Sequence, residues 1–218
     1  MTHHKIKHHL DDATLMAYAA GSLPEAFNLI AATHLSLCDT CRAAAEALDA
    51  VGGTLLDNKA DAVEVAEDSL ARTLARLDDA APVAPTRSAP VSDGLPAPLR
   101  SYVGGDLDSI RWRPVGMGVK QAILKTSRSA TARLLFIPAG AAMPDHGHNG
   151  TEMTMVLKGA FQDDDDYFAR GDVEIADADV HHVPVADIHE DCICLAVTDA
   201  PLRFEGLLPR IWQKFARI

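Results

Sequence analysis

Two groups of metal-binding side chains stand far apart in this chain and differ in kind. His34, Cys38 and Cys41 follow one another at short spacing, and their imidazole and thiolate donors are typical of a closed structural zinc site. The second group lies far downstream, in the pattern Gly140-x5-His146-x-His148-x3-Glu152-x6-Gly159. Its imidazole and carboxylate donors suit a metal inside a β-barrel. We therefore expect two domains with different tasks.

The first cluster leaves two local structures open. If residues 34–41 form one helix, the spacing places the three donors on one face. If the helix instead breaks near Leu37, His34 ends one helix, and Cys38 and Cys41 begin the next. Either arrangement brings three donors to one point, and the thiolates favour zinc.

The fourth donor of this cluster must come from another segment. His9 stands just before the first expected helix, where a chain crossing the end of the helices would place it. His8 is its rival, and His3 and His4 are less favoured because they precede every expected element. Position in the chain leaves this choice open.

The second cluster matches the first motif of the cupin family at every defined position. His146 and His148 are two residues apart, so on a strand their side chains point the same way. Glu152 keeps that parity if the strand stays regular. Three donors facing a barrel interior then need a fourth from a later strand.

The resemblance to cupins implies a fourth donor from a second motif, in which a histidine follows a glycine by eleven positions. Counting from Gly171 gives His182, whereas the adjacent His181 would face the other side of a strand. Asp177 and Asp179 replace the Pro and Gly of that motif. Three imidazoles and a carboxylate suit zinc, iron, manganese or nickel, and zinc is the first choice for this second divalent metal.

Signals for the starts and ends of helices dominate the first 80 residues. Asp11 is an N-cap for a short helix that Gly21 ends. Ser22-Leu23-Pro24-Glu25 has a capping-box pattern, with Ser22 as N-cap of a second helix. Apolar periodicity predicts two more helices, at residues 39–55 and 70–77. We expect an all-α four-helix domain over residues 1–80.

The character of the chain changes after residue 80. Five prolines between residues 82 and 98 disfavour both helix and sheet, so residues 81–99 are expected to form a flexible, semi-extended linker. Such a linker would not act as a rigid lever between the two domains. Short β-rich runs separated by turns then predict an all-β barrel over residues 100–218. Asp163–Asp166 is read as an exposed hairpin tip. The expected strands are residues 119–125, 131–137, 152–158, 172–176 and 190–197.

Length and charge limit the function classes. A chain of 218 residues can hold two small domains, each with its own core. The net charge of −11 argues against direct binding to nucleic acid and favours a basic partner surface. We see no signal-peptide pattern and no apolar run of the ~20 residues that a membrane span needs. We therefore expect a cytoplasmic protein without a membrane partner, whose cysteines are thiols or metal ligands.

The spacing His9-x24-His34-x3-Cys38-x2-Cys41 resembles the zinc-binding anti-sigma domain of bacteria. Residues 34–41 and Ala17–Gly21 resemble the ChrR family in particular, and the resemblance covers nearly the whole chain. It implies that His9 is the fourth donor. It also implies a helical domain that inhibits an extracytoplasmic-function sigma factor, followed by a metal-binding cupin-like domain that senses singlet oxygen or oxidative stress.

Two other interpretations remain open. One is a cupin metalloenzyme, of dioxygenase or isomerase type, with a helical regulatory domain; the other is a zinc-dependent scaffold. Capture of a sigma factor by residues 1–80 favours the anti-sigma factor, which is not an enzyme, and turnover of a small molecule favours the metalloenzyme. Cys192 and Cys194 share strand parity, and we interpret them as small buried hydrophobes, because a redox role needs an accessible thiolate.

Overall fold

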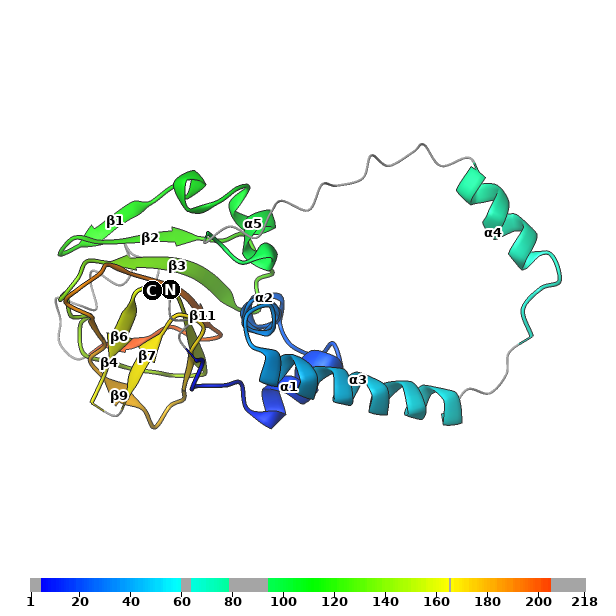
Figure 1. Cartoon of the computed structure of the whole chain (residues 1–218), viewed down its shortest axis with the longest axis horizontal. Coiled ribbons are helices and arrows are strands. Elements are labelled where there is room, and N and C mark those ends of the chain that lie inside the picture. The colour runs from blue at the N-terminus through cyan, green and yellow to red at the C-terminus, as the bar shows by residue number, and fades with distance from the viewer. Residues whose placement is uncertain (1–4, 60–63, 79–93, 165, 205–218) are drawn as a thin grey trace.

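The computed structural model describes residues 5–59, 64–78, 94–164 and 166–204. Helices come first and strands follow, as the sequence predicted (Figure 1). Helix α2 lies against the strands, α1 and α3 pack on α2 and on each other, and α4 stands apart (Figure 1). The four helices of the N-terminal region are α1 (Asp12–Ala19), α2 (Glu25–Leu35), α3 (Asp39–Lys59) and α4 (Ser69–Asp78).

The capping residues of the first helices are those predicted, with one exception. The carboxylate of Asp11 accepts a hydrogen bond of 2.6 Å from the backbone N–H of Thr14, and Gly21 adopts a positive φ of 64° after α1. Ser22, however, does not cap α2. Its hydroxyl donates to the carbonyl of Ala17 and so closes the turn after α1, while α2 begins at Glu25 behind Pro24. The capping-box prediction was therefore wrong.

The last residues of the predicted linker, from residue 94 on, have defined structure. Helix α5 (Ala97–Val103) follows Pro96 and holds Pro98 in its first turn. Proline is tolerated there because the first N–H groups of a helix have no intrahelical partner. Leu95 and Leu99 are fully buried, so residues 94–99 belong to the folded body rather than to a linker. Residues 79–93 lie outside the described part of the chain.

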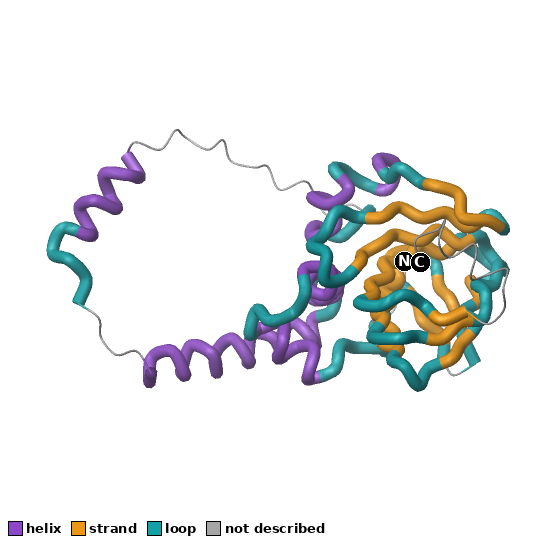
Figure 2. Tube along the Cα trace, turned by 180° about the vertical axis from the view of Figure 1, so that it is seen from behind, coloured by secondary structure: helices purple, strands orange, loops and turns teal. Residues whose placement is uncertain are grey.

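Three small sheets make up the β domain, in which the strands wrap around an interior (Figure 2). The largest has six strands in the order β1-β2-β3-β11-β5-β8. Its members are β1 (Arg113–Gly116), β2 (Val119–Ile123), β3 (Thr131–Ile137), β5 (Glu152–Lys158), β8 (Val173–Ala176) and β11 (Cys192–Thr198). All five expected strands are in this sheet.

The remaining strands are short and were not predicted. Each has only two or three residues, which is too few to show an alternating pattern. They form two sheets in the orders β10-β6-β7 and β12-β4-β9. Their bounds are β4 (His146–Gly147), β6 (Ala160–Gln162), β7 (Tyr167–Ala169), β9 (His181–His182), β10 (Val185–Ala186) and β12 (Arg203–Phe204); a short 3-10 turn, η1, covers Leu107–Ser109.

The two faces of the six-stranded sheet have different neighbours. Side chains alternate along each strand, so Arg133, Thr154 and Cys194 line an interior cavity. The intervening residues, such as Leu134 and Leu195, are buried on the opposite face in a core that they share with α2. Two separate cores were expected, but α2 packs directly on β3, β5 and β11. Because of this contact, packing joins the two domains in addition to the chain that connects them.

The shared core should make the helices and the sheet unfold together. Ile30 on α2 has no exposed surface and belongs to this core. We expect Ile30→Ala to lower the free energy of unfolding by about 2–5 kcal/mol, because it leaves a cavity. Ile188→Ala, at an exposed loop position, is the control and should change little. Denaturant unfolding followed by far-UV circular dichroism and by tryptophan fluorescence measures both. Separate transitions for the two probes in the wild type would contradict a shared core.

Candidate metal centres

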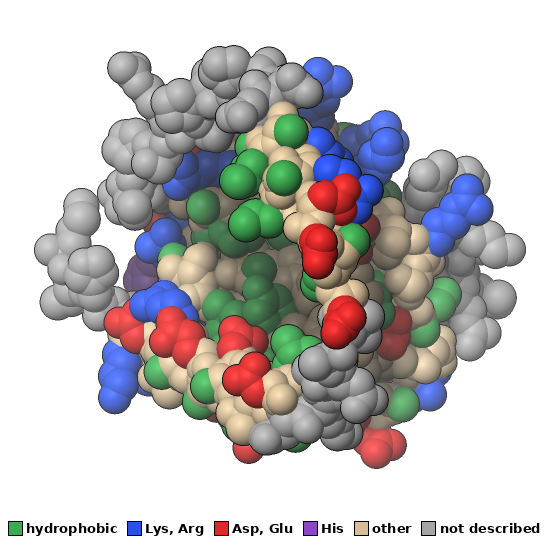
Figure 3. All heavy atoms as spheres, turned by 90° about the vertical axis from the view of Figure 1, so that its right-hand side faces the viewer, with side chains coloured by type: hydrophobic (Ala, Val, Ile, Leu, Met, Phe, Trp, Pro, Cys, Tyr) green, Lys and Arg blue, Asp and Glu red, His purple; other side chains and the backbone are tan. Residues whose placement is uncertain are grey.

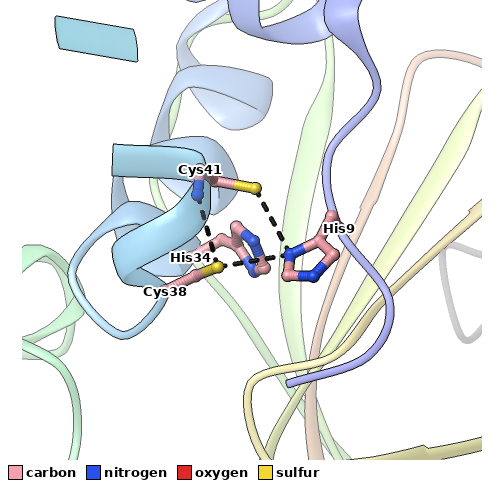
Figure 4. Close-up of side chains that lie close together, drawn as sticks. All are labelled: His9, His34, Cys38 and Cys41. Atoms are coloured by element: carbon pink, nitrogen blue, oxygen red, sulfur yellow. Dashed lines mark hydrogen bonds between the residues drawn. The ribbon is translucent and has the colours of Figure 1, made fainter. Parts of the chain in front are cut away.

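Four side chains from three segments converge at the junction between α2 and α3. Donor atoms of His9, His34, Cys38 and Cys41 all lie within 4.8 Å of one another (Figure 4). Nδ1 of His9 is 3.3 Å from Sγ of Cys38 and 3.5 Å from Sγ of Cys41. Since α2 ends at Leu35 and α3 begins at Asp39, the helix breaks between the histidine and the first cysteine, which is the second of the two predicted geometries.

Hydrogen bonding shows which nitrogen of His34 is available to a metal. Nδ1 lies 2.9 Å from the carbonyl oxygen of Gly171, and a carbonyl only accepts, so this nitrogen carries the proton. Nε2 is buried and has no hydrogen-bond partner among the described residues. Burial also lowers the pKa of His34, which keeps the ring neutral. A buried nitrogen without a partner is costly, and a metal ion would satisfy it.

The two thiols fit the same interpretation. Cys38 and Cys41 are both 3% exposed and form no disulfide. Burial raises the pKa of Cys41 to about 11, with a further contribution from the neighbouring Cys38. A thiol with such a pKa stays protonated near neutral pH unless a metal displaces the proton. Converging buried thiols and imidazoles are therefore suited to zinc.

The structure separates His9 from its rival. His9 faces the two sulfur atoms, whereas Nε2 of His8 lies 2.8 Å from the carboxylate of Asp166 on the β6–β7 hairpin. The rings of His8 and Phe168 are in contact, with centroids 4.4 Å apart. His8 is thus directed toward the β domain and not toward the cysteines. His3 and His4 lie outside the described residues.

A second cluster lies inside the β domain. His146, His148 and His182 form a buried group with converging ring nitrogens. Nε2 of His182 is 3.2 Å from Nε2 of His146 and 3.3 Å from Nε2 of His148. Nδ1 of His146 lies 2.8 Å from the carbonyl of Pro144, so the ring turns Nε2 toward the other two histidines. His181 is directed away, with Nδ1 2.9 Å from Asp145.

Glu152 lies beside this cluster without joining the converging nitrogens. Its Oε2 is 3.4 Å from Nδ1 of His148, and its Oε1 accepts a hydrogen bond from Thr154. The carboxylate lines the same cavity as His146 and His182. Burial would raise its pKa, but contact with His148 and the charge of His146 lower it below the ordinary value. Metal ligation by Glu152 stays a prediction.

Two acidic residues behind His182 were not predicted as part of the site. Nδ1 of His182 is 2.7 Å from Oε1 of Glu174 and 3.6 Å from Oδ2 of Asp163. Burial would lower the pKa of His182, but the Glu174 carboxylate raises it. Such a carboxylate fixes the ring so that Nε2 faces the metal. The side chain of Asp163 is 6% exposed, so this end of the expected hairpin tip points inward.

The interior has other features that bear on its chemistry. The cavity of about 50 Å³ is bounded by Arg133, Glu152, Glu174 and apolar side chains. By the measure in which one water needs ~10–15 Å³, this is room for a few waters beside the histidines.

Cys192 and Cys194 are fully buried with their sulfur atoms 3.3 Å apart. Contact with Cys192, and burial, hold the pKa of Cys194 far above its ordinary value, which opposes formation of a reactive thiolate.

Fold and clusters define a class: a helical domain with a thiolate–imidazole centre, joined to a cupin-like domain with a histidine centre. Comparison with known proteins agrees. Residues 101–201 match the family model described as the ChrR cupin-like domain. The chain is 57% identical to the anti-sigma-E factor ChrR of Cereibacter sphaeroides, over 98% of this chain and 99% of that protein. The chain belongs to the ChrR family.

One solved structure agrees with this assignment. The crystal structure of Rhodobacter sphaeroides SigE in complex with the anti-sigma ChrR matches with a TM-score of 0.77 and 55% identity, covering 89% of this chain and all of that one. An RmlC-like cupin protein from Ralstonia eutropha is 27% identical over 44% of this chain and 68% of its own, with a TM-score of 0.39. No helix in the described part of the chain is long and apolar enough to cross a membrane.

Adjacent histidines provide a matched test of the helical cluster. His9→Gln should remove one metal ion per chain, because Nδ1 of His9 is the donor that faces both sulfur atoms. His8→Gln should leave the metal content unchanged, because His8 faces Asp166. Elemental analysis of the purified full-length variants measures both. Equal metal loss in the two variants would show that the donor was assigned incorrectly.

Zinc affinity at the helical cluster should rise with pH. Because burial raises the pKa of the Cys41 thiol to about 11, zinc must displace its proton throughout the neutral range. Apparent affinity should increase about tenfold per pH unit for each proton displaced. The lowered pKa of His34 means that this ring is already unprotonated and adds nothing to the slope. Chelator competition at several pH values around neutrality gives the slope, and affinity independent of pH would refute this argument.

Proposed function

We propose that this chain is an anti-sigma factor, not an enzyme, and that its helical domain binds and inhibits an extracytoplasmic-function sigma factor in the cytoplasm. Two findings support the proposal. The relative that spans nearly the whole chain is named an anti-sigma-E factor, and the matching solved complex pairs such a protein with SigE. The observation within this chain that carries it is a set of apolar helix faces that none of the described residues covers.

The apolar faces lie on α3 and α4. Leu70, Leu74 and Leu77 repeat at helical spacing along α4, and 70%, 51% and 65% of their surfaces are exposed. On α3, Val51 and Leu55 are one turn apart and also more than half exposed. Figure 3 shows a broad hollow with hydrophobic side chains around it. Apolar stripes of this kind mark a protein interface.

Charge favours a basic partner. The chain carries a net charge of −11, and Glu46, Asp49 and Asp57 on α3 are exposed. Acidic side chains gather along the hollow in Figure 3. A sigma factor has basic surfaces because it binds DNA, and complementary charge speeds association and selects the partner. Direct binding of this chain to nucleic acid is disfavoured by the same charge.

Both metal centres take part in this proposal. Zinc in the helical cluster would fix the junction between α2 and α3, and so the direction in which α3 leaves the sheet. His146, His148, Glu152 and His182 would hold a second divalent metal, with zinc as first choice, in the cupin domain. That domain would act as the sensor for release, in a response to singlet oxygen or oxidative stress. The metalloenzyme alternative is disfavoured because the cavity has room for only a few waters.

The α4 surface allows a direct test. Leu74→Asp should weaken binding to a sigma factor from the same cell about tenfold or more, because a charge would enter the apolar contact. Ala75→Asp makes a similar change on another side of α4 and is the matched control. Calorimetric titration of the full-length variants measures affinity, and transcription in vitro measures inhibition.

Two results would contradict the proposal. Binding that is equally strong in both variants and the wild type would exclude the α4 face as the contact. Failure of the wild type to bind any sigma factor of its own cell, together with turnover of a small molecule by the cupin domain, would favour the metalloenzyme instead.

A further inference from the structure

One short segment contacts the outer nitrogens of both metal clusters. The carbonyl of Gly171 is 2.9 Å from Nδ1 of His34 in the helical cluster. Three residues later, the carboxylate of Glu174 is 2.7 Å from Nδ1 of His182 in the cupin cluster. In both histidines the opposite nitrogen, Nε2, is the one available to a metal. Residues 171–174 therefore support one histidine of each cluster.

The side chain between these two contacts joins the domains a second time. Asp172 has no exposed surface. Its Oδ1 accepts hydrogen bonds from the backbone N–H groups of Lys7, at 2.6 Å, and His8, at 3.0 Å. Its Oδ2 accepts from the N–H of Ala169 at 2.9 Å, which closes the turn before β8. A buried carboxylate is stable only with such donors, so losing them would be costly.

The N-terminal segment held by Asp172 runs directly into the helical cluster. The N–H of Val173 lies 3.3 Å from the carbonyl of His8, and His9 follows as the donor that faces both cysteines. Gly171 has a φ of 96°, and a Cβ there would lie 2.6 Å from Cδ1 of Ile6. The glycine thus allows the N-terminal segment to lie close against the turn.

These contacts have a physical consequence for the two clusters. A metal bound through Nε2 of His182 would fix that ring, and the fixed ring would hold Glu174 and β8. The position of β8 sets Gly171 and Asp172, which in turn hold His34 and the segment that presents His9. Loss of the cupin metal would free this support, and the donors of the helical cluster would be less well arranged.

We propose that residues 171–174 couple the two clusters, so that metal bound in the cupin cavity strengthens metal binding at the helical cluster. This inference rests on the proposed function for its biological meaning, because it names the route by which a sensor would reach the sigma-binding helices. The coupling itself is a property of the free protein. Thermodynamic linkage requires it to be reciprocal, and couplings between sites are commonly about 5- to 150-fold in affinity.

Cobalt allows the helical cluster to be observed separately in the full-length chain. Its thiolates give a sulfur-to-metal charge-transfer band, which a site built from histidine and carboxylate lacks. We expect His146→Ala, which weakens the cupin site, to reduce cobalt affinity at the thiolate cluster at least about fivefold. Glu174→Gln should have a similar effect, and in the double variant the second substitution should add little. Glu190→Gln, at an exposed acid of the same domain, is the matched control and should match the wild type.

Hydrogen exchange gives a readout that does not depend on cobalt. The amides of Lys7 and His8, which donate to Asp172, should exchange faster in His146→Ala than in the metal-loaded wild type. Unchanged cobalt affinity and unchanged exchange in His146→Ala would overturn the coupling. Additive effects of His146→Ala and Glu174→Gln would also overturn it, because the two would then act independently.

The outcomes also separate this inference from the proposed function. Intact coupling in a chain that binds no sigma factor would remove the anti-sigma function alone. Normal sigma binding without coupling would remove the inference alone. Asp172→Asn adds a direct test of the turn: it should weaken the thiolate cluster if it folds. If it does not fold, the comparison of His146→Ala with the wild type still decides the matter.

Discussion

The hydrogen bond between His34 and the carbonyl of Gly171 is the interaction on which the arrangement of both domains depends. It joins α2 to the turn before β8 at a buried position, and it fixes the tautomer that directs Nε2 toward the cysteines. The same contact requires α2 to lie on the outer face of the six-stranded sheet, where Ile30 and Leu195 are buried. Docking of the helices on the β domain therefore supports the orientation of His34 in the helical cluster.

Burial lowers the pKa of a histidine in each centre, but a neighbouring carboxylate offsets this effect only at His182. In the helical cluster it keeps the Cys41 thiol protonated and His34 neutral, so the site is costly without a metal and favourable with one. In the cupin cavity, Glu174 offsets the burial of His182 and keeps its ring oriented. The first centre thus favours a closed structural role. The second lies beside a small cavity with room for a few waters.

Patterns with a strong local cause could be predicted from the sequence. The Asp11 cap, the five longer strands and the grouping of His34 with Cys38 and Cys41 depend on spacing or capping chemistry that one segment contains, whereas the choice of His9 came from the family resemblance. Contacts between distant segments could not be predicted in this way. Asp172 and Glu174 look like ordinary acidic residues beside a strand, and only the fold brings them to Lys7 and His182. The parity of Glu174 on its strand, opposite to that of Val173, was the one available signal.

The predictions from the prolines near residue 96 and from the acidic run at residue 163 were wrong for a related reason. Pro96 and Pro98 were read as part of a linker, although the same residues fit the start of α5, and the distinction depends on whether Leu95 and Leu99 find a core. Asp163 was read as part of a solvated tip, but the hairpin folds this residue back toward His182. Tertiary packing decides between two structures that local chemistry allows equally.

Magnitudes limit how the cupin domain can control a bound sigma factor. A partner held at nanomolar Kd is bound by about 12 kcal/mol, whereas coupling between sites commonly supplies about 1–3 kcal/mol. Changing the metal occupancy of the cupin cavity would therefore weaken binding of the sigma factor without releasing all of it, unless the partner is scarce or the released chain is removed. Disrupting the helical cluster itself would have a larger effect on sigma binding, because the buried thiols and imidazoles would lose the metal that they share. The start of α3 would then no longer be fixed. A link that acts on the helical cluster, rather than on α3 and α4 directly, would lower the metal affinity of that cluster by the coupling free energy, and with it the fraction of chains whose apolar faces are held in place for the partner.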